Sequence, residues 1–117
     1  MPGYLTTHVL DTANGTPAQG MKIELYRLDG GERRLLAETV TNHDGRTDKH
    51  ILPESEFATG EYELLFHVGA WLDGQGHQAA KPRFLDVVPL RFGMSEQDHY
   101  HVPLLISPYG FSTYRGS

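Results

Sequence analysis

The amino-acid sequence predicts an all-β protein, an antiparallel β-sandwich of seven or eight short strands with one short helix. Apolar and polar residues alternate along several segments, which is the period of a half-buried strand. Turn signals rich in Gly, Pro, Asn and Asp separate these segments at regular spacing. The length of 117 residues fits one domain, 1–117, and no internal repeat divides it.

The first half of the chain predicts a strand and then a hairpin. Residues 6–12 are rich in strand-forming types and lead to a turn signal, Asn-Gly-Thr-Pro, at 14–17. Residues 21–26 alternate strictly between apolar and polar types, and residues 34–41 are expected to pair with them as the second arm of a hairpin. A second turn, Asn-His-Asp-Gly at 42–45, follows the hairpin.

The second half supplies the only helix that we expect, at residues 53–60. Pro suits its first turn, two acids suit its positively polarised N-terminal end, and Gly suits its end. Residues 62–68 alternate again and predict a strand. A long connection is expected over residues 69–82, and connections of that length are often functional or mobile. Residues 83–92 predict a strand that is broken at Pro89.

The last strand is expected at residues 99–106, where the chain alternates between two faces. The apolar face is expected to join the core, and the other face carries two histidines away from it. Pro103 has no amide hydrogen for a strand ladder, so it predicts that this strand lies at an edge or is interrupted. The core face consists of Tyr100, Val102, Leu104 and Ile106, and the other face of His99, His101, Pro103 and Leu105.

The composition excludes several functional classes. The formal net charge of −5 leaves no basic footprint for nucleic acid, and no apolar run is long enough to span a membrane. The chain has no Cys, which removes disulfides, thiolate catalysis and Cys-based zinc sites. The first residues lack the pattern of a secretory signal, so a cytoplasmic location is expected, with a peroxisomal or periplasmic one left open.

Seven histidines are many for a chain of this size, and their ordinary pKa lies nearest neutrality. His8 and His101 are the best candidates for catalysis, because each sits in a strand among apolar residues that would hold its ring. An equal alternative for both is a buried or interface histidine with a satisfied hydrogen bond. His99 shares a strand face with His101 and is a weaker candidate for a supporting role. The others are expected at the solvated surface: His43, His50, His67 and His77.

Other catalytic groups have less support from pattern alone. Arg46 follows the second turn, where a surface arginine is the commoner alternative, and Arg115 fits a structural ion pair equally well. His99 and His101, with His8, could form a three-histidine zinc site, but no HExxH motif makes this specific, and we expect no metal. Gly-x-Ser-x-Gly and phosphate-loop motifs are absent from the sequence.

Several motifs together resemble one family, the transthyretin-related 5-hydroxyisourate hydrolases. The resemblance covers essentially the whole chain. Its most specific part is the final Tyr-Arg-Gly-Ser, because the hormone-carrying transthyretins share the fold but lack that ending. Ile106 and Phe111 stand where Leu and Tyr are more usual. The motifs are Leu5-Thr6-Thr7-His8-Val9-Leu10-Asp11-Thr12-Ala13, Asn42-His43-Asp44-Gly45-Arg46, Tyr100-His101-Val102-Pro103-Leu104-Leu105, Ser107-Pro108-Tyr109-Gly110 and Tyr114-Arg115-Gly116-Ser117.

The resemblance implies a transthyretin-like sandwich of two four-stranded sheets with one short helix, and a homotetramer with active sites in the channel between dimers. It implies hydrolysis of 5-hydroxyisourate, the product of urate oxidation, to 2-oxo-4-hydroxy-4-carboxy-5-ureidoimidazoline, without a cofactor. The family's catalytic residues fall on His8, Arg46, His101 and Ser117. Contacts to the substrate are expected from His8, Arg46, Tyr114 and Ser117.

This assignment predicts a chemical mechanism. The two imidazoles would deprotonate a water molecule and assist the leaving nitrogen, while the Arg46 guanidinium would stabilise charge on the attacked carbonyl oxygen. The Ser117 hydroxyl and the terminal carboxylate would orient a histidine or pair with an arginine. Two alternatives are a transthyretin-like carrier of a small apolar or hormone-like ligand, for which an apolar channel is expected, and a purely structural interaction domain.

Overall fold

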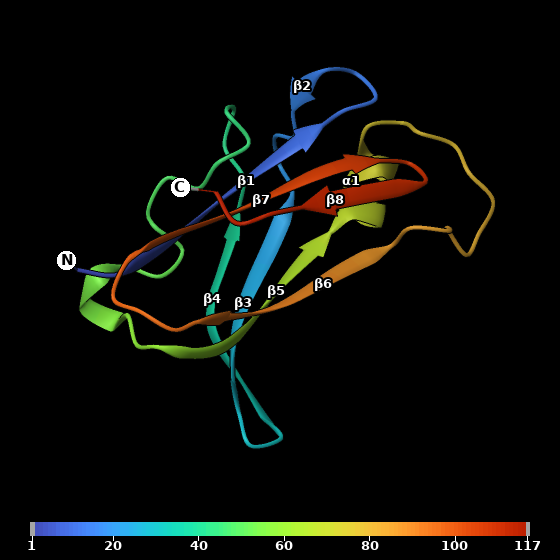
Figure 1. Cartoon of the computed structure of the whole chain (residues 1–117). Coiled ribbons are helices and arrows are strands. Elements are labelled where there is room, and N and C mark those ends of the chain that lie inside the picture. Colours follow the sequence, from blue (N-terminus) through green and yellow to red (C-terminus); the bar gives the residue numbers. More distant parts are fainter. Residues whose placement is uncertain (1, 117) are drawn as a thin grey trace.

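Two four-stranded sheets pack face to face in the protein (Figure 1). The computed structural model describes residues 2–116. One sheet has the strand order β2-β1-β7-β8 and the other β4-β3-β5-β6. The strands are β1 (Tyr4–Asp11), β2 (Thr16–Pro17), β3 (Lys22–Asp29), β4 (Glu32–Val40), β5 (Gly60–His67), β6 (Val87–Met94), β7 (His99–Ser107) and β8 (Gly110–Thr113). The predicted β-sandwich is confirmed.

One strand pair departs from the antiparallel prediction. β1 and β7 run parallel, in a register that places Thr6 opposite His101 and Tyr4 opposite His99. All other neighbouring strands are antiparallel. The parallel pair joins strands from opposite ends of the chain at the centre of the first sheet, so a local alternation pattern contains no signal for it.

The core lies between the sheets and is formed by the apolar positions that alternate along the strands. Each of the three best-defined alternations has a buried face, as the sequence predicts. These faces are Met21, Ile23 and Leu25; Tyr62, Leu64, Phe66 and Val68; and Tyr100, Val102, Leu104 and Ile106. Leu5 and Val9 of β1 complete the same layer, with no exposed surface.

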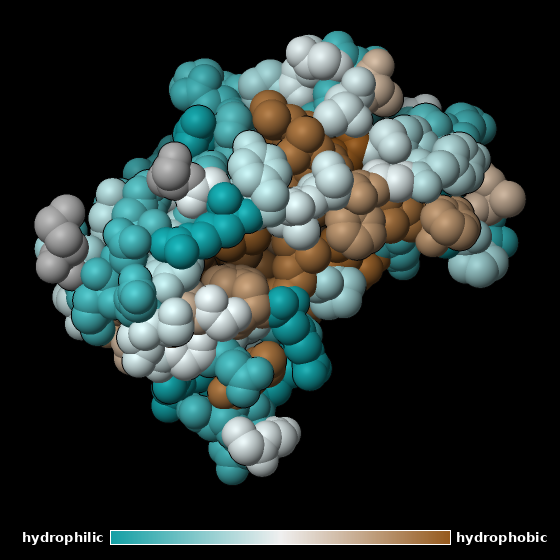
Figure 2. Space-filling model, viewed as in Figure 1, coloured by the Kyte–Doolittle hydropathy of each residue, from teal (hydrophilic) through white to brown (hydrophobic). Residues whose placement is uncertain are grey.

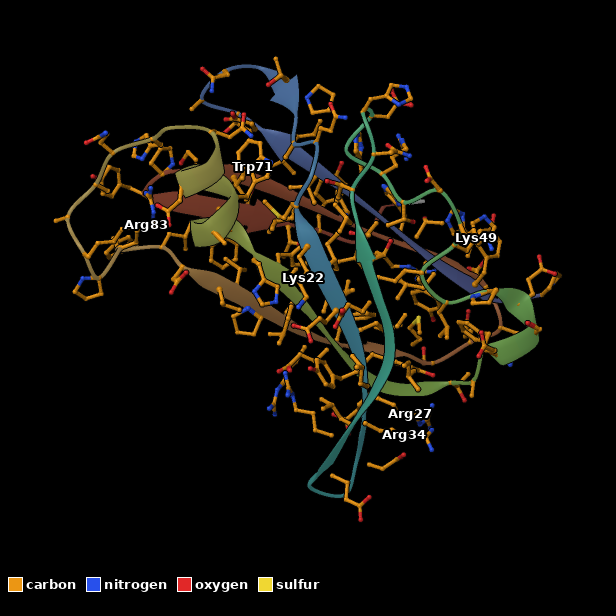
Figure 3. All side chains as sticks on the ribbon, turned by 180° about the vertical axis from the view of Figure 1, so that it is seen from behind. Lys22, Arg27, Arg34, Lys49, Trp71 and Arg83 are labelled. Carbon is orange, nitrogen blue, oxygen red and sulfur yellow. The ribbon has the colours of Figure 1, made fainter. Side chains whose placement is uncertain are left out.

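The predicted helix at residues 53–60 is wrong. That segment forms only one 3₁₀ turn, Glu54–Glu56, whereas the α-helix α1 spans Val68–Gly74 at the start of the expected long loop. The buried residues Val68, Trp71 and Leu72 have the i, i+3, i+4 spacing of a helix face. The Trp71 Nε1–H also donates to the Gln19 carbonyl at 2.6 Å, which fixes α1 against the sandwich (Figure 3).

Neither proline interrupts its strand, contrary to the prediction. β7 is continuous through Pro103 and lies inside its sheet, between β1 and β8. The Pro103 carbonyl accepts from Thr113 Oγ1 at 2.8 Å and therefore faces the end of β8. The nitrogen of a strand residue faces the same side as its carbonyl, so the absent amide hydrogen of Pro103 costs no ladder bond there. β6 is continuous through Pro89 because it is an edge strand, where proline is tolerated.

Within residues 2–116, no helix is long and apolar enough to cross a membrane. The cytoplasmic location stays a prediction of the sequence.

We expect Leu104→Ala to lower the free energy of unfolding by about 2–5 kcal/mol, because it removes a large side chain from a site without exposed surface. Urea unfolding at fixed protein concentration measures the change. Leu35→Ala is the matched control, since Leu35 is 49% exposed on β4 and its truncation should cost far less. Equal losses for both variants would contradict this account of the core.

Candidate functional site

The outward face of the β1–β7 pair gathers the polar side chains that point away from the core. Tyr4, Thr6 and His8 alternate with buried residues along β1, and His99 and His101 do so along β7. The parallel register places the two sets side by side. The candidate site therefore lies on one face of a sheet and not between the two sheets.

Arg46 reaches this face through the turn at residues 42–45. Gly45 has φ +74°, and its amide and carbonyl bond Asn42 and Val9. A β-carbon at Gly45 would collide with the Val9 carbonyl oxygen, so the close approach of turn and strand requires glycine. The next residue, Arg46, then forms an isolated β-bridge with His8. Among residues 2–116, no acidic side chain forms an ion pair with Arg46.

His8 and His101 face each other, with ring centroids 6.4 Å apart. Nε2 of His8 lies 2.9 Å from the Asp44 carbonyl oxygen. A carbonyl only accepts, so Nε2 carries the hydrogen and Nδ1 is the nitrogen that can take a proton. Burial, followed by the positive charge of Arg46, lowers the pKa of both His8 and His101 below the ordinary 6.5. Both imidazoles are therefore neutral at pH 7 and can accept protons.

A cavity of about 480 Å³ lies over this face, between β1, β7 and residues 46–50, and its lining includes Arg46, His99 and His101. His50 and Tyr4 also line it, and they stack with His99 into a column of three rings. The Tyr4 ring lies 4.4 Å from that of His50 and 4.1 Å from that of His99. His50 is exposed, as the sequence predicts, and the structure also makes it part of the wall of this cavity.

Ser117 lies outside the described residues. Its neighbour Gly116 donates from its amide to the His101 carbonyl at 2.7 Å. A β-carbon at Gly116 would stand 2.8 Å from Cδ2 of His101, so the chain passes directly against this imidazole.

The polar cluster on this face consists of Tyr4, Thr6, His8, Arg46, His50, His99 and His101. Tyr114 and Arg115 are not part of this cluster within one chain. Both line a separate cavity of about 330 Å³ between β6 and β7, and Tyr114 is 61% exposed. Arg115 pairs with Asp98 at 3.2 Å and lies over the Tyr100 ring, which is the structural role that the sequence left open.

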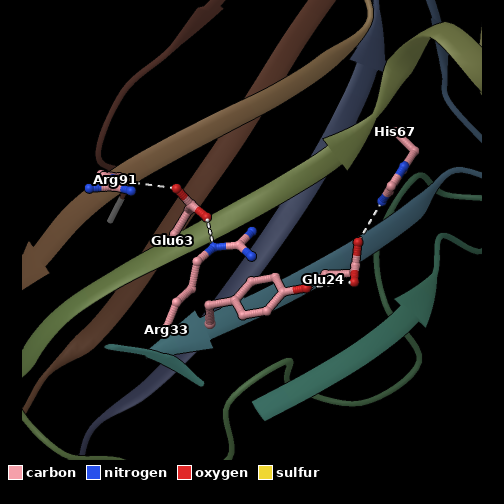
Figure 4. A network of polar contacts seen from close by, with 6 residues as sticks. Glu24, Arg33, Glu63, His67 and Arg91 are labelled. Atoms are coloured by element: carbon pink, nitrogen blue, oxygen red, sulfur yellow. Dashed lines mark hydrogen bonds and ion pairs between the residues drawn. The ribbon is translucent and has the colours of Figure 1, made fainter. Parts of the chain in front are cut away.

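The remaining histidines lie outside the cluster. Nε2 of His67 is 2.6 Å from Glu24, and the His67 side chain is 26% exposed, so the predicted surface histidine is a half-buried member of a polar network (Figure 4). In the same network Glu63 is held between Arg33 and Arg91. His77 contacts Arg83, and His43 is an exposed neighbour of Asp44. Within residues 2–116, no three His, Asp or Glu side chains come together as a metal-binding group.

Two members of the site, Tyr4 and Thr6, were not predicted from the sequence. Their signal was present in the spacing, since they precede His8 by four and two residues and so share its strand face. The pairing of β1 with β7 could not be predicted from the sequence. Thr6 gains its role from hydrogen bonds to His99 and His101, which lie more than 90 positions away.

Comparison with known proteins gives a consistent result. The model of the HIUase/Transthyretin family matches residues 5–116. A 5-hydroxyisourate hydrolase of Mesorhizobium japonicum is 63% identical over 115 residues, which cover 98% of this chain and 93% of that protein.

Two solved structures share the fold. The structure of Klebsiella pneumoniae 5-hydroxyisourate hydrolase has a TM-score of 0.81 and 37% identity, covering 98% of this chain and 99% of that one. An (S)-allantoin synthase structure has a TM-score of 0.92 and 50% identity; the match covers 98% of this chain but only 44% of that longer one.

Replacing Arg46 by Met should raise the pKa of both His8 and His101, because the substitution removes a positive charge that opposes protonation of each ring. NMR titration of the ring protons measures both values. Arg34→Met, at an exposed position on β4 in the other sheet, serves as the control and should leave them unchanged. Unchanged pKa values in the Arg46 variant would show that the guanidinium does not face the two imidazoles.

Proposed function

The chain belongs to the HIUase/Transthyretin family and is a 5-hydroxyisourate hydrolase of urate catabolism, and we propose that His8, Arg46 and His101 form its catalytic centre. One observation carries the proposal: two neutral imidazoles and a guanidinium, from three separate segments, meet on one sheet face. Residues 1–117 form a single domain in this proposal, since both sheets share one core.

The imidazoles activate water. Opening the ring of 5-hydroxyisourate requires water to attack a carbonyl carbon, and a positioned general base accelerates such a step roughly 10²–10⁴-fold. The lowered pKa values of His8 and His101 keep both rings unprotonated at neutral pH. One ring takes the proton of the water, and the other positions the water or protonates the leaving nitrogen.

Arg46 stabilises the charge that develops on the attacked oxygen. A guanidinium is permanently charged and presents paired donors in a plane, which suits the oxygens of a flat heterocycle. Preorganised donors of this kind are a large catalytic contribution in many hydrolases. The turn at Gly45 holds the backbone of Arg46 beside His8, so little reorganisation is needed during the reaction.

We assign Ser117 to the same centre as a group that orients His101 or the substrate. Support comes from Gly116, whose amide donates to the His101 carbonyl and where an added β-carbon would stand 2.8 Å from Cδ2 of the His101 ring. A substrate contact from Tyr114 requires a second chain, because Tyr114 lines a different cavity in its own chain.

The active form is a homotetramer in this proposal. The cluster lies on an outward sheet face, where its own chain supplies only the sheet and residues 46–50 as walls, whereas binding sites for small molecules bury most of the ligand. Apolar surface extends over β8 toward β6 (Figure 2). Its exposed members include Phe84, Val87, Tyr109, Phe111 and Tyr114, and exposed apolar patches mark association surfaces.

The carrier alternative is less well supported. A pocket for an apolar ligand has predominantly hydrophobic walls with few polar groups. The cavity of this protein is lined by Arg46, Thr6, His99, His101 and their polar neighbours.

Arg46→Lys should lower kcat/KM by about 10²-fold, because one flexible ammonium cannot replace paired donors aimed at the developing oxyanion. 5-Hydroxyisourate is generated with urate oxidase, and its decay is followed by ultraviolet absorbance. Arg34→Lys on β4 is the matched control and should retain full activity. A wild-type protein that does not accelerate the decay would overturn the function, and full activity of Arg46→Lys would overturn the role of Arg46.

Phe111→Glu should dissociate the tetramer and lower activity, since it places a charge in the apolar surface of β8. Light scattering during gel filtration measures the mass. Leu35→Glu is the control, because Leu35 is 49% exposed on β4 and Phe111 is 46% exposed. A fully active wild-type monomer would contradict the need for a second chain at the site.

A further inference from the structure

We propose that the Thr6 hydroxyl connects His99 and His101 into one proton relay, through which His99 stores the proton that His101 takes up. The inference rests on the catalytic centre proposed above. It gives a role to Thr6 and His99, which that centre leaves without one.

Thr6 stands between the two rings at hydrogen-bond distance from both. Its Oγ1 lies 2.7 Å from Nε2 of His99 and 2.7 Å from Nδ1 of His101. The parallel pairing produces this geometry. Thr6 is directly opposite His101, and Tyr4, the next residue on the same face of β1, is opposite His99.

Counting hydrogens couples the two rings. A threonine hydroxyl has one hydrogen to donate and lone pairs to accept. With both imidazoles neutral, the relay uses the arrangement in which Thr6 donates to one ring and accepts an N–H from the other. In this arrangement a hydrogen on Nδ1 of His101 goes with an unprotonated Nε2 in His99, and the reverse. When Nδ1 of His101 carries the hydrogen, Nε2 of His101 is free to act as a base.

Proton transfer through this link is balanced. Nε2 of His101 takes a proton from the attacking water as the oxygen bonds to the substrate carbon. The Nδ1–H bond of His101 then breaks and its proton passes to Thr6 Oγ1, while the original Thr6 hydroxyl proton passes to Nε2 of His99. His99 becomes the imidazolium, and His101 is neutral with a hydrogen on Nε2. That hydrogen can go to the leaving nitrogen as the relay runs back.

The surrounding charges favour storing the proton on His99. Burial has the largest effect and lowers the pKa of both rings. The charges of Arg46, His8 and His99 then all oppose a positive charge on His101. On His99, His50 opposes a positive charge and Asp98 partly offsets this by favouring one. The titratable and charged groups around the pair are Tyr4, His8, Arg46, Asp48, His50, Asp98 and Arg115.

The ring of His99 is also held in the orientation that the relay needs. It stacks on Tyr4 with planes 10° apart, and Tyr4 stacks in turn on His50. A ring clamped in this way keeps Nε2 directed at Thr6.

Kinetics of Thr6 variants test the relay. Thr6→Val removes the hydroxyl at nearly constant side-chain volume. It should lower kcat about tenfold, which is part of the rate enhancement from general acid–base catalysis, and should leave KM little changed. Thr6→Ser keeps the hydroxyl and should retain at least half of the wild-type kcat. Thr12→Val is the matched control, because the Thr12 hydroxyl also joins the β1 side to β7, by donating to the Ile106 carbonyl, far from the cluster.

A double-mutant cycle separates the relay from simple support. His99→Gln can still hydrogen-bond Thr6 but cannot store a proton, so it should lower kcat by a similar factor. The Thr6→Val/His99→Gln double variant should be no slower than the slower single variant, since both changes break one path. Independent, multiplying losses would contradict the relay, as would wild-type kcat in Thr6→Val.

Nitrogen NMR of the histidine rings gives a readout that needs no activity. In the wild-type protein, the resonances of His99 Nε2 and His101 Nδ1 should report complementary protonation and shift together during titration. In Thr6→Val the two rings should titrate separately. Separate titration in the wild-type protein would overturn the relay even if the enzyme is active. Coupled rings in a protein without hydrolase activity would instead count against the proposed function alone.

Discussion

The parallel pairing of β1 with β7 is the constraint on which the site depends. It brings the start of the chain beside its last long strand, so that Thr6 lies opposite His101. Side chains alternate along both strands, and a shift of one residue would turn every polar ring of one strand into the core. The register is held because the other face of each strand is buried, with Leu5 and Val9 on β1 and Leu104 and Ile106 on β7 without exposed surface. The packing of the core therefore sets the geometry of the polar cluster on the opposite face.

Positive charge and burial act together on the two catalytic imidazoles. Arg46 could serve as an oxyanion donor at many positions, but here it stands beside His8 and lowers the pKa of both that ring and His101. A general base must be unprotonated before the reaction and must release its proton afterwards. A neighbouring guanidinium favours both requirements, because its positive charge disfavours the protonated imidazole before and after the proton transfer. The same repulsion gives a reason for the proton on His101 to move on, toward the less crowded His99.

The sequence predicted those features that depend on the residues of a single strand or turn. Alternation located β3, β5 and β7 together with their buried faces, and the turn at residues 42–45 was expected where Gly45 adopts a positive φ. It failed where the neighbours of a segment decide. Pro103 is tolerated inside a sheet because β8 ends beside it. α1 forms where the Trp71 side chain hydrogen-bonds the Gln19 carbonyl. The resemblance to a family pointed to His8, Arg46 and His101, but the positions of Thr6 and His50 required the fold.

The placement of the cluster on an outward sheet face has an energetic consequence for assembly. In a single chain the rings of His8 and His101 are only partly buried and Arg46 is exposed, so water screens the interactions between them. A facing subunit would remove that water and strengthen both the repulsion that keeps the imidazoles neutral and the attraction of Arg46 for a developing oxyanion. Desolvation would also lower the imidazole pKa values further, in the direction that catalysis by a neutral base needs. In this view the core of each chain aligns the groups, and association supplies the low-polarity surroundings in which they become effective.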